Sequence, residues 1–107
     1  MVKERRGSPR LRVNMDTYLE SGTERHRAVI LDLSHKGCFV LTPKQLSTSA
    51  PVRVEVGKPG LLHMTLDGAV ARSVSGKGLG IRFKDVTATQ RTLLTKLLQS
   101  IVQQGLK

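Results

Sequence analysis

Up to about residue 83 this chain consists of short apolar runs separated by residues typical of turns. Beyond that point the apolar residues recur at a different spacing. The clearest run is at 52–56, where three valines alternate with Arg53 and Glu55. Such alternation predicts a half-buried β-strand, because successive side chains of a strand point to opposite faces. The sequence therefore predicts a set of antiparallel β-strands followed by a single helix.

The strands are expected where apolar runs lie between glycine, proline and serine residues. The predicted ranges are 11–20, 25–33, 38–41, 52–56, 62–66, 69–74 and 79–83. The pair Asp67-Gly68 predicts a tight turn or bulge between two of these strands, and 44–50 predicts a loop.

The last segment has the period of an α-helix, predicted over 87–104. Thr87 and Gln90 have the spacing of a capping box at its start, and Gly105 is a suitable stop. Its apolar residues recur three and four positions apart, as one stripe: Leu93, Leu94, Leu97, Leu98, Ile101 and Val102. We expect this stripe, through Leu94, Leu97, Leu98 and Ile101, to cover one opening or face of a small antiparallel barrel or half-open sandwich.

The chain has 107 residues, enough for one domain, and 18 Lys and Arg against 8 Asp and Glu, which gives a formal charge of +10. A basic surface of this size suits an anionic partner: a nucleic acid, a nucleotide, an acidic protein or a membrane surface. The alternative is a basic surface that serves solubility alone. The distribution of the charge along the chain has to distinguish this alternative from an anionic partner.

We expect a soluble, cytoplasmic protein. The single cysteine, Cys38, excludes an internal disulfide and is predicted to be a small core residue. Residues 1–14 have no apolar stretch behind their basic residues, so no signal peptide is expected. No apolar run approaches the roughly 18 residues of a membrane span, so no membrane partner is expected either.

Nothing in the sequence predicts an enzyme or a metal site. His35 and Cys38 are a single pair without a second pair, and alternation along a strand would place them on opposite faces. The glycine-rich stretch "GKGLG" leads into a strand rather than a helix, which argues against a phosphate-cradling loop.

The basic charge is concentrated near the start of the chain. Residues 3–12 contain five basic side chains and one acidic one, for a local net charge of +4. Arg6 and Arg10 flank Gly7-Ser8-Pro9, and the proline excludes a helix there. We expect residues 1–12 to form a flexible basic arm that presents the guanidinium groups of Arg6 and Arg10, and the alternative is a solvated basic tail.

A polar segment, "DLSHKG", follows the apolar run at 28–31. In a continuing strand, Asp32 and Ser34 would point to the same side, one pleat apart and near the barrel surface. Gly37 could take a positive φ and turn the chain into the next strand. The alternative for Asp32 is an acid that caps a turn.

The two polar segments together resemble a known family signature. Arg6 and Arg10 form the pattern RxxxR, and Asp32, Ser34 and Gly37 form the pattern (D/N)xSxxG some twenty residues later. Either pattern alone is weak, but in this order and at this separation they are specific, and they resemble the signature of PilZ domains.

The stretch "ARSVSGKGLGIRFKDV" at 71–86 is similar to the later strand pair of that family, and the resemblance covers about residues 4–104. It implies a six-stranded antiparallel PilZ-type β-barrel closed by a C-terminal helix, all-β with one helix, with the whole of 1–107 as one domain. Many PilZ domains bind the bacterial second messenger cyclic di-GMP.

The resemblance implies a role for each matching residue. Arg6 and Arg10 would pair with phosphate or guanine and stack on the base, and Asp32 would accept from guanine N1–H and N2–H₂. Ser34 would add a hydroxyl bond, and Gly37 would let the backbone turn beside the ligand.

In this family a basic residue directly before RxxxR tends to accompany an intercalated ligand dimer. Here that residue is Arg5, so a cyclic di-GMP dimer is expected. Some members have further ligand contacts on the strand that here holds Arg72, where "ARSV" lacks the aromatic found in those members.

The leading hypothesis is a stand-alone cyclic di-GMP receptor that orders its basic arm over the ligand and so changes a surface facing an unknown downstream protein. The second hypothesis is a small basic β-barrel that binds RNA or DNA. It leaves the acidic Asp32 beside the arm unexplained, and three aromatic residues offer little surface for base stacking. A third is a PilZ-like domain that has lost ligand binding and serves protein interaction only.

Overall fold

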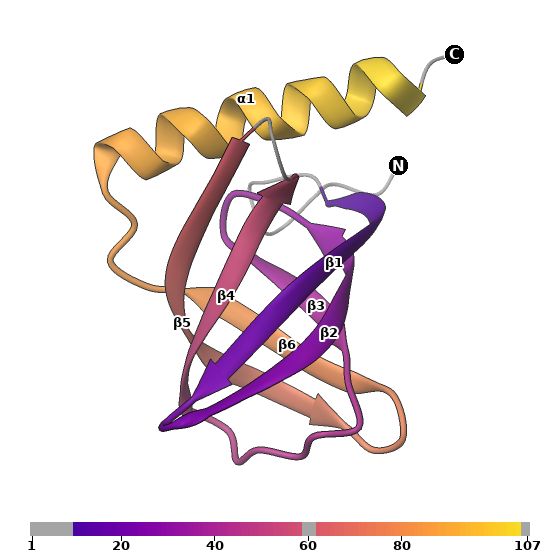
Figure 1. The fold of residues 1–107 in the computed structure, drawn as a ribbon, viewed down its shortest axis with the longest axis vertical. Coiled ribbons are helices and arrows are strands. Elements are labelled where there is room, and N and C mark those ends of the chain that lie inside the picture. Colours follow the sequence, from indigo (N-terminus) through magenta and orange to yellow (C-terminus); the bar gives the residue numbers. More distant parts are fainter. Residues whose placement is uncertain (1–9, 59–61, 106–107) are drawn as a thin grey trace, which may run out of the picture.

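The computed structural model describes residues 10–58 and 62–105, which form six β-strands and one helix (Figure 1). The strands are β1 (Leu11–Ser21), β2 (Glu24–Leu33), β3 (Gly37–Leu41), β4 (Pro51–Lys58), β5 (Leu62–Val74) and β6 (Gly78–Phe83). The helix, α1, spans Ala88–Gly105.

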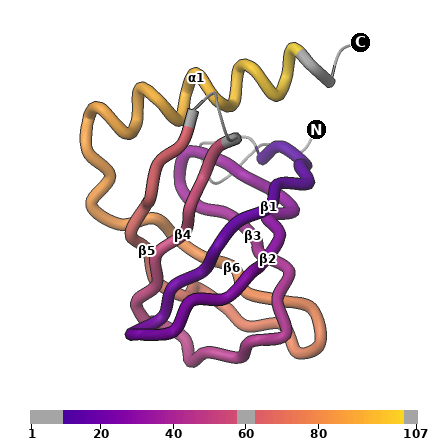
Figure 2. Tube along the Cα trace, viewed as in Figure 1, coloured from indigo at the N-terminus to yellow at the C-terminus, as the bar shows by residue number. Residues whose placement is uncertain are grey.

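The six strands close into an antiparallel barrel in the order β1-β2-β3-β6-β5-β4. The pairing that closes the ring, between β1 and β4, joins only Leu19 with Val54 and Glu20 with Arg53. In both Figure 1 and Figure 2, α1 crosses one end of the barrel above β4 and β5, and the β1–β2 turn lies at the opposite end. The prediction of an all-β barrel closed by one helix is confirmed.

Apolar side chains from all six strands fill the barrel. The alternation at 52–56 is confirmed, since its three valines are buried and Arg53 is exposed. Cys38 is also buried, as expected. The core side chains of the strands are Met15, Leu19, Ala28, Ile30, Leu33, Cys38, Val40, Val52, Val54, Val56, Met64, Leu66, Val70, Leu79, Ile81 and Phe83.

The predicted break at Asp67-Gly68 is wrong, because β5 runs without interruption through both residues. Gly68 pairs with Val52 on one side and Phe83 on the other, so it is a strand residue between two neighbours. A Cβ at this position would come within 2.7 Å of the Arg82 carbonyl oxygen. The glycine therefore permits a close approach of β6 and does not make a turn.

The start of α1 has the predicted capping box. The Gln90 N–H donates to the Thr87 hydroxyl at 3.0 Å, and the Thr87 N–H donates to the Gln90 side-chain oxygen at 3.1 Å. The Gln90 side-chain amide also donates to the Thr65 carbonyl of β5 at 3.2 Å, which ties the first turn of the helix to the barrel.

The apolar stripe of α1 packs on the barrel through Leu94, Leu97 and Leu98, all buried, while Ile101 is partly buried against the same core. Val102, predicted as part of the stripe, is instead 43% exposed. At 100° per residue it lies beyond the edge of the face that Leu94 and Leu98 define. Within the described residues, no helix is both long and apolar enough to cross a membrane.

Replacement of Leu97 tests whether α1 is an integral part of the core. Leu97 is only 4% exposed, so Leu97→Ala should lower the free energy of unfolding by about 2–5 kcal/mol, through lost burial and the cavity left behind. Val102→Ala is the matched control on the same helix and should change it by less than about 0.5 kcal/mol. Chemical denaturation gives both values, and equal, small effects would show that α1 is peripheral to the fold.

Candidate functional site

A register shift in β2 places the acid of the "DLSHKG" segment. Ala28 and Ile30 point into the barrel, so strict alternation would bury Asp32 as well. The pairing of β2 with β3 shifts between Ile30 and Asp32, and after the shift Leu33 is the buried residue. The bulge therefore moves Asp32 to the outer face of the barrel.

Asp32 lies beside Arg10 without a close ion pair. The Arg10 Nε atom is 3.9 Å from Oδ1 of Asp32, beyond hydrogen-bond distance, and the Asp32 side chain is 25% exposed. Its Oδ1 atom is buried and has no hydrogen-bond partner among the described residues. A buried acceptor without a partner is costly, and it marks a place where a ligand donor would be stabilised.

The strand β2 ends at Leu33, as predicted, so the expectation that Ser34 points to the same side as Asp32 in an extended strand is wrong. The Ser34 hydroxyl accepts from the Lys36 N–H at 3.1 Å and the Gly37 N–H at 3.2 Å, while the Ser34 N–H donates to the Gly37 carbonyl at 2.9 Å. Ser34 is buried, so it does not share an exposed face with Asp32. What it does is hold the β2–β3 loop, and contact with a ligand stays a prediction.

Gly37 has a different role from the one expected, since its φ is not positive. It is the first residue of β3 and pairs with Arg82 of β6. A Cβ at Gly37 would collide with the Ile81 carbonyl oxygen. The Phe83 N–H also donates to the Lys36 carbonyl at 2.8 Å. The loop therefore lies tightly against β6, which a side chain at position 37 would prevent.

A cavity of about 790 Å³ opens beside this loop. It is of the size that commonly holds a small ligand. Five of its side chains are lysine or arginine, against one acid, Asp85, so it favours an anion. The lining residues are Arg10, Ser34, His35, Lys36, Gly37, Ala71, Arg72, Gly80, Ile81, Arg82, Phe83, Asp85, Val86 and Arg91.

The cavity brings together three of the predicted site residues, Arg10, Ser34 and Gly37. Asp32 does not line it but lies just beyond Arg10. Arg5 and Arg6 lie outside the described residues.

Next to the cavity, one cross-strand row runs over the outer face of the barrel. Asp32 pairs with Phe39, Phe39 with Gly80, and Gly80 with Arg72. A Cβ on Gly80 would come within 3.0 Å of the Arg72 side chain, so the glycine leaves room for Arg72. The Arg72 guanidinium lies 5.8 Å from the centre of the Phe39 ring. An aromatic ring thus does accompany Arg72, although it comes from β3.

Sequence reasoning missed several cationic residues of the cavity. Arg82 could have been found as the polar position of the "LGIRF" strand, which must point outward if its neighbours are buried. Arg91 carries no such signal, because only the docking of α1 on the barrel brings it to the cavity. Neither these two residues nor Arg72 forms an ion pair with another described residue.

The structure separates His35 and Cys38, although not by alternation along a strand, because His35 lies in the β2–β3 loop and only Cys38 belongs to β3. His35 contacts Thr95 of α1, with 2.8 Å between Nε2 and the hydroxyl, while Cys38 lies inside the barrel. Burial raises the pKa of the Cys38 thiol, and the nearby Asp32 carboxylate raises it further. The thiol is therefore protonated and unreactive at neutral pH. In the described part of the chain, no three metal-binding side chains are grouped.

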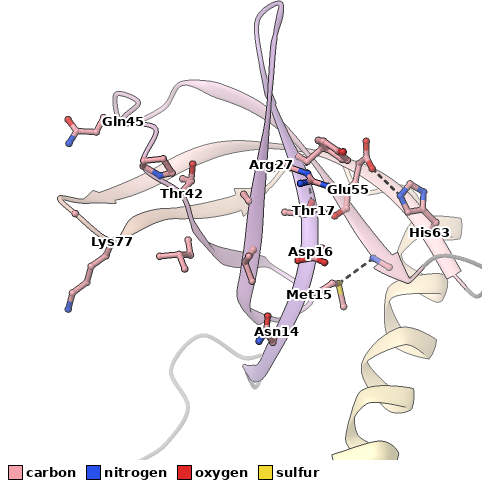
Figure 3. Close-up of a pocket in the computed structure, with 17 residues that line it drawn as sticks. Asn14, Met15, Asp16, Thr17, Arg27, Thr42, Gln45, Glu55, His63 and Lys77 are labelled. Atoms are coloured by element: carbon pink, nitrogen blue, oxygen red, sulfur yellow. Dashed lines mark hydrogen bonds and ion pairs between the residues drawn. The ribbon is translucent and has the colours of Figure 1, made fainter.

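A larger hollow, of about 1040 Å³, follows β1 and contains none of the predicted site residues (Figure 3). Its charges are mixed, since Asp16 and Glu55 oppose Arg27 and Lys77. Glu55 is already engaged: a hydrogen bond from Arg25 lowers its pKa, and His63 lies 3.2 Å away.

Part of this hollow lies where β1 and β4 separate beyond their two paired positions. The Gly57 N–H donates to the Met15 sulfur at 3.4 Å, and the Thr17 hydroxyl donates to the Glu55 carbonyl, so side chains replace the missing ladder (Figure 3). This hollow is an open seam of the barrel with balanced charge. The cationic cavity at the β2–β3 loop is the better candidate for a ligand site.

Comparison with known proteins gives a family for the chain. The family model described as PilZ domain matches residues 4–100. Among curated protein sequences, none matches. Among solved structures, a complex of MrkH from K. pneumonia with c-di-GMP is similar at 21% identity and a TM-score of 0.78, over 99% of this chain.

Two further structures have the same fold. The PilZ domain of YcgR from Escherichia coli, solved with c-di-GMP, is 20% identical with a TM-score of 0.68, and the match covers 97% of this chain and 99% of that one. MotI/DgrA, an inhibitor of motility from Bacillus subtilis, is 16% identical with a TM-score of 0.75 over 94% of this chain. This chain spans 55% of MrkH and 53% of MotI, about half of each.

Proposed function

The chain belongs to the PilZ domain family, and we propose that it is a receptor for cyclic di-GMP that binds at the cavity beside the β2–β3 loop. The observation that carries the proposal is that this cavity combines Arg10, from the RxxxR motif, with Ser34 and Gly37, from the (D/N)xSxxG motif. PilZ domains are receptor modules rather than enzymes, in agreement with the sequence-based prediction.

The chemistry of the cavity suits this ligand. Cyclic di-GMP carries two phosphates and two guanines, and guanidinium groups can pair with phosphate oxygens, with guanine O6 and N7, or with the face of a base. The cavity offers Arg10, Arg72, Arg82 and Arg91 for these contacts. The similar MrkH and YcgR structures were solved with c-di-GMP, which supports the same ligand class here.

Asp32 is proposed to accept from the N1–H and N2–H₂ edge of one guanine. The unpartnered Oδ1 atom supports this role, because a donor from the ligand would satisfy it. Arg10 lies beside this carboxylate, so we expect Arg10 to change its position when a base enters.

Two proposals concern the residues before β1. Arg6 is proposed to act with Arg10 on phosphate and guanine, and Arg5 is proposed to support an intercalated pair of cyclic di-GMP molecules. Leu11 and Arg12 already belong to β1, so the arm in question ends at Arg10 rather than at residue 12. We further propose that ligand binding orders residues 1–10 over the site.

The output of the receptor is proposed to be protein interaction. Ordering of the arm would change the surface that the chain offers to a downstream protein, without any chemical step. Binding of RNA or DNA remains the competing function. Against it, Asp32 would repel a phosphate backbone, and Phe39 and Tyr18 are the only aromatic residues on the outer face of the described barrel.

Replacement of Asp32 distinguishes a nucleotide receptor from a nucleic-acid clamp. In a guanine site, Asp32→Ala leaves two base donors unpaired and should weaken cyclic di-GMP binding about tenfold, with less discrimination against cyclic di-AMP. On a nucleic-acid surface, removal of the acid should leave oligonucleotide binding unchanged or stronger. Titration calorimetry with these three ligands separates the two functions.

Asp67→Ala is the matched control, because this acid is exposed and pairs with Arg53 away from the cavity. It should bind cyclic di-GMP like the wild type, whereas Arg10→Ala should lose most of the affinity. A stoichiometry of two ligands per chain would support the dimer, and a value of one would contradict it. Unchanged nucleotide binding in both Asp32→Ala and Arg10→Ala would contradict the site itself.

Limited trypsin digestion tests the ordering of the arm. If the ligand orders residues 1–10, cleavage after Arg5 and Arg6 should slow several-fold when cyclic di-GMP is added. Cleavage after Lys77, in the exposed β5–β6 loop, is the internal control and should keep its rate. Mass spectrometry of the products gives each rate separately. Unchanged cleavage after Arg5 and Arg6 at saturating ligand would contradict the ordering.

A further inference from the structure

The structure assigns a ligand-binding role to Arg91 of α1, through its guanidinium group and a phosphate of the bound nucleotide. This inference rests on the proposed function and extends the site from the barrel to the helix. Three observations support it: the position of Arg91 in the cavity, its lack of an ion-pair partner among residues 10–58 and 62–105, and the hydrogen bonds that connect its turn of the helix to the β2–β3 loop.

Arg91 lies in the first turns of α1 and lines the cavity from the side of the helix. Arg10 and the β2–β3 loop line the same cavity from the side of the barrel. The backbone N–H of Arg91 donates to the Thr87 carbonyl at 2.9 Å, so Arg91 belongs to the well-formed start of the helix. Its side chain is exposed and pairs with no carboxylate of the described residues. A guanidinium free of other partners at the wall of a cationic cavity is suited to phosphate.

Two hydrogen bonds in sequence connect the β2–β3 loop to the backbone of Arg91. The Thr95 hydroxyl donates to the Arg91 carbonyl at 3.0 Å, and the Nε2 atom of His35 lies 2.8 Å from the same hydroxyl. A hydroxyl has one proton to donate, so when the Thr95 hydroxyl donates to the Arg91 carbonyl it accepts from His35, with the His35 proton on Nε2. His35 and Thr95 thus act as positioning residues for the turn that carries Arg91.

The consequence is that one ligand contacts both the barrel and α1. The helix is held on the barrel by Leu94, Leu97 and Leu98, and by the Gln90 and His35 hydrogen bonds. A phosphate bound between Arg10 and Arg91 would add a further link at the same end of the barrel. Ligand binding therefore strengthens the docking of α1 as well as occupying the site.

Removal of the Arg91 charge tests the inference directly. Arg91→Gln should bind cyclic di-GMP about tenfold more weakly than the wild type, as expected for loss of one charge-assisted contact. Its affinity should also fall less steeply with added salt, because one ion pair is lost. Lys96→Gln is the matched control, since Lys96 is an exposed cation of the same helix that does not line the cavity. It should bind like the wild type.

The outcomes separate this inference from the proposed function. Wild-type affinity of Arg91→Gln, together with weak binding by Arg10→Ala, would overturn the role of Arg91 and leave the receptor function in place. Absence of cyclic di-GMP binding by the wild-type chain would overturn both. An equal loss in Arg91→Gln and Lys96→Gln would show a general effect of helix charge and would also overturn the assignment.

A double-mutant cycle tests the positioning role of Thr95. Thr95→Val removes the hydroxyl with little change of shape, and it should weaken cyclic di-GMP binding several-fold in the wild-type chain. In the Arg91→Gln chain the same replacement should have no further effect, because the residue that it positions is already lost. Additive losses would contradict the positioning role, and thermal unfolding of each variant confirms that it is folded.

Discussion

The shift of register in β2 between Ile30 and Asp32 is the constraint on which the site depends. Without it, the strand would bury the Asp32 carboxylate and expose Leu33. Both changes would destabilise the fold, because a buried carboxylate loses its hydration and an exposed leucine no longer fills the core. With it, Leu33 enters the core and Asp32 reaches the outer face beside Arg10. The irregular pairing of β2 between Ile30 and Asp32 thus places a polar side chain at the end of a core strand.

A second constraint is the close approach of β3 and β5 to β6. Gly37 and Gly68 each lie where a Cβ would meet a backbone carbonyl of Ile81 or Arg82. The approach holds the β2–β3 loop against β6, so residues far apart in the sequence line one cavity. Glycine serves here for contact between strands, and neither position has the positive φ typical of turns.

The alternation of apolar residues predicted most of the barrel, and the three-to-four spacing with its capping box predicted α1, because burial on one face leaves a clear pattern in a sequence. The prediction failed at Gly68, where the glycine permits close packing of two strands and does not make a turn. It also failed at Ser34, whose hydroxyl accepts a hydrogen bond within the β2–β3 loop. Arg91 could not be predicted, because its place in the cavity depends on how the helix docks on the barrel. The resemblance to PilZ domains, carried by two short motifs, is confirmed by the family match.

The most direct test of the proposed site is a titration of the uniformly ¹⁵N-labelled chain with cyclic di-GMP, in which the amide chemical shifts are followed. We expect the shift changes to concentrate at Ser34–Gly37, at Gly80–Arg82 and around Arg91. Titration of the same chain with cyclic di-AMP should give only small changes. Changes centred on Asp16, Glu55 and His63, in the hollow of Figure 3, would contradict the proposed site. The absence of any change at saturating concentrations would contradict the proposed receptor function.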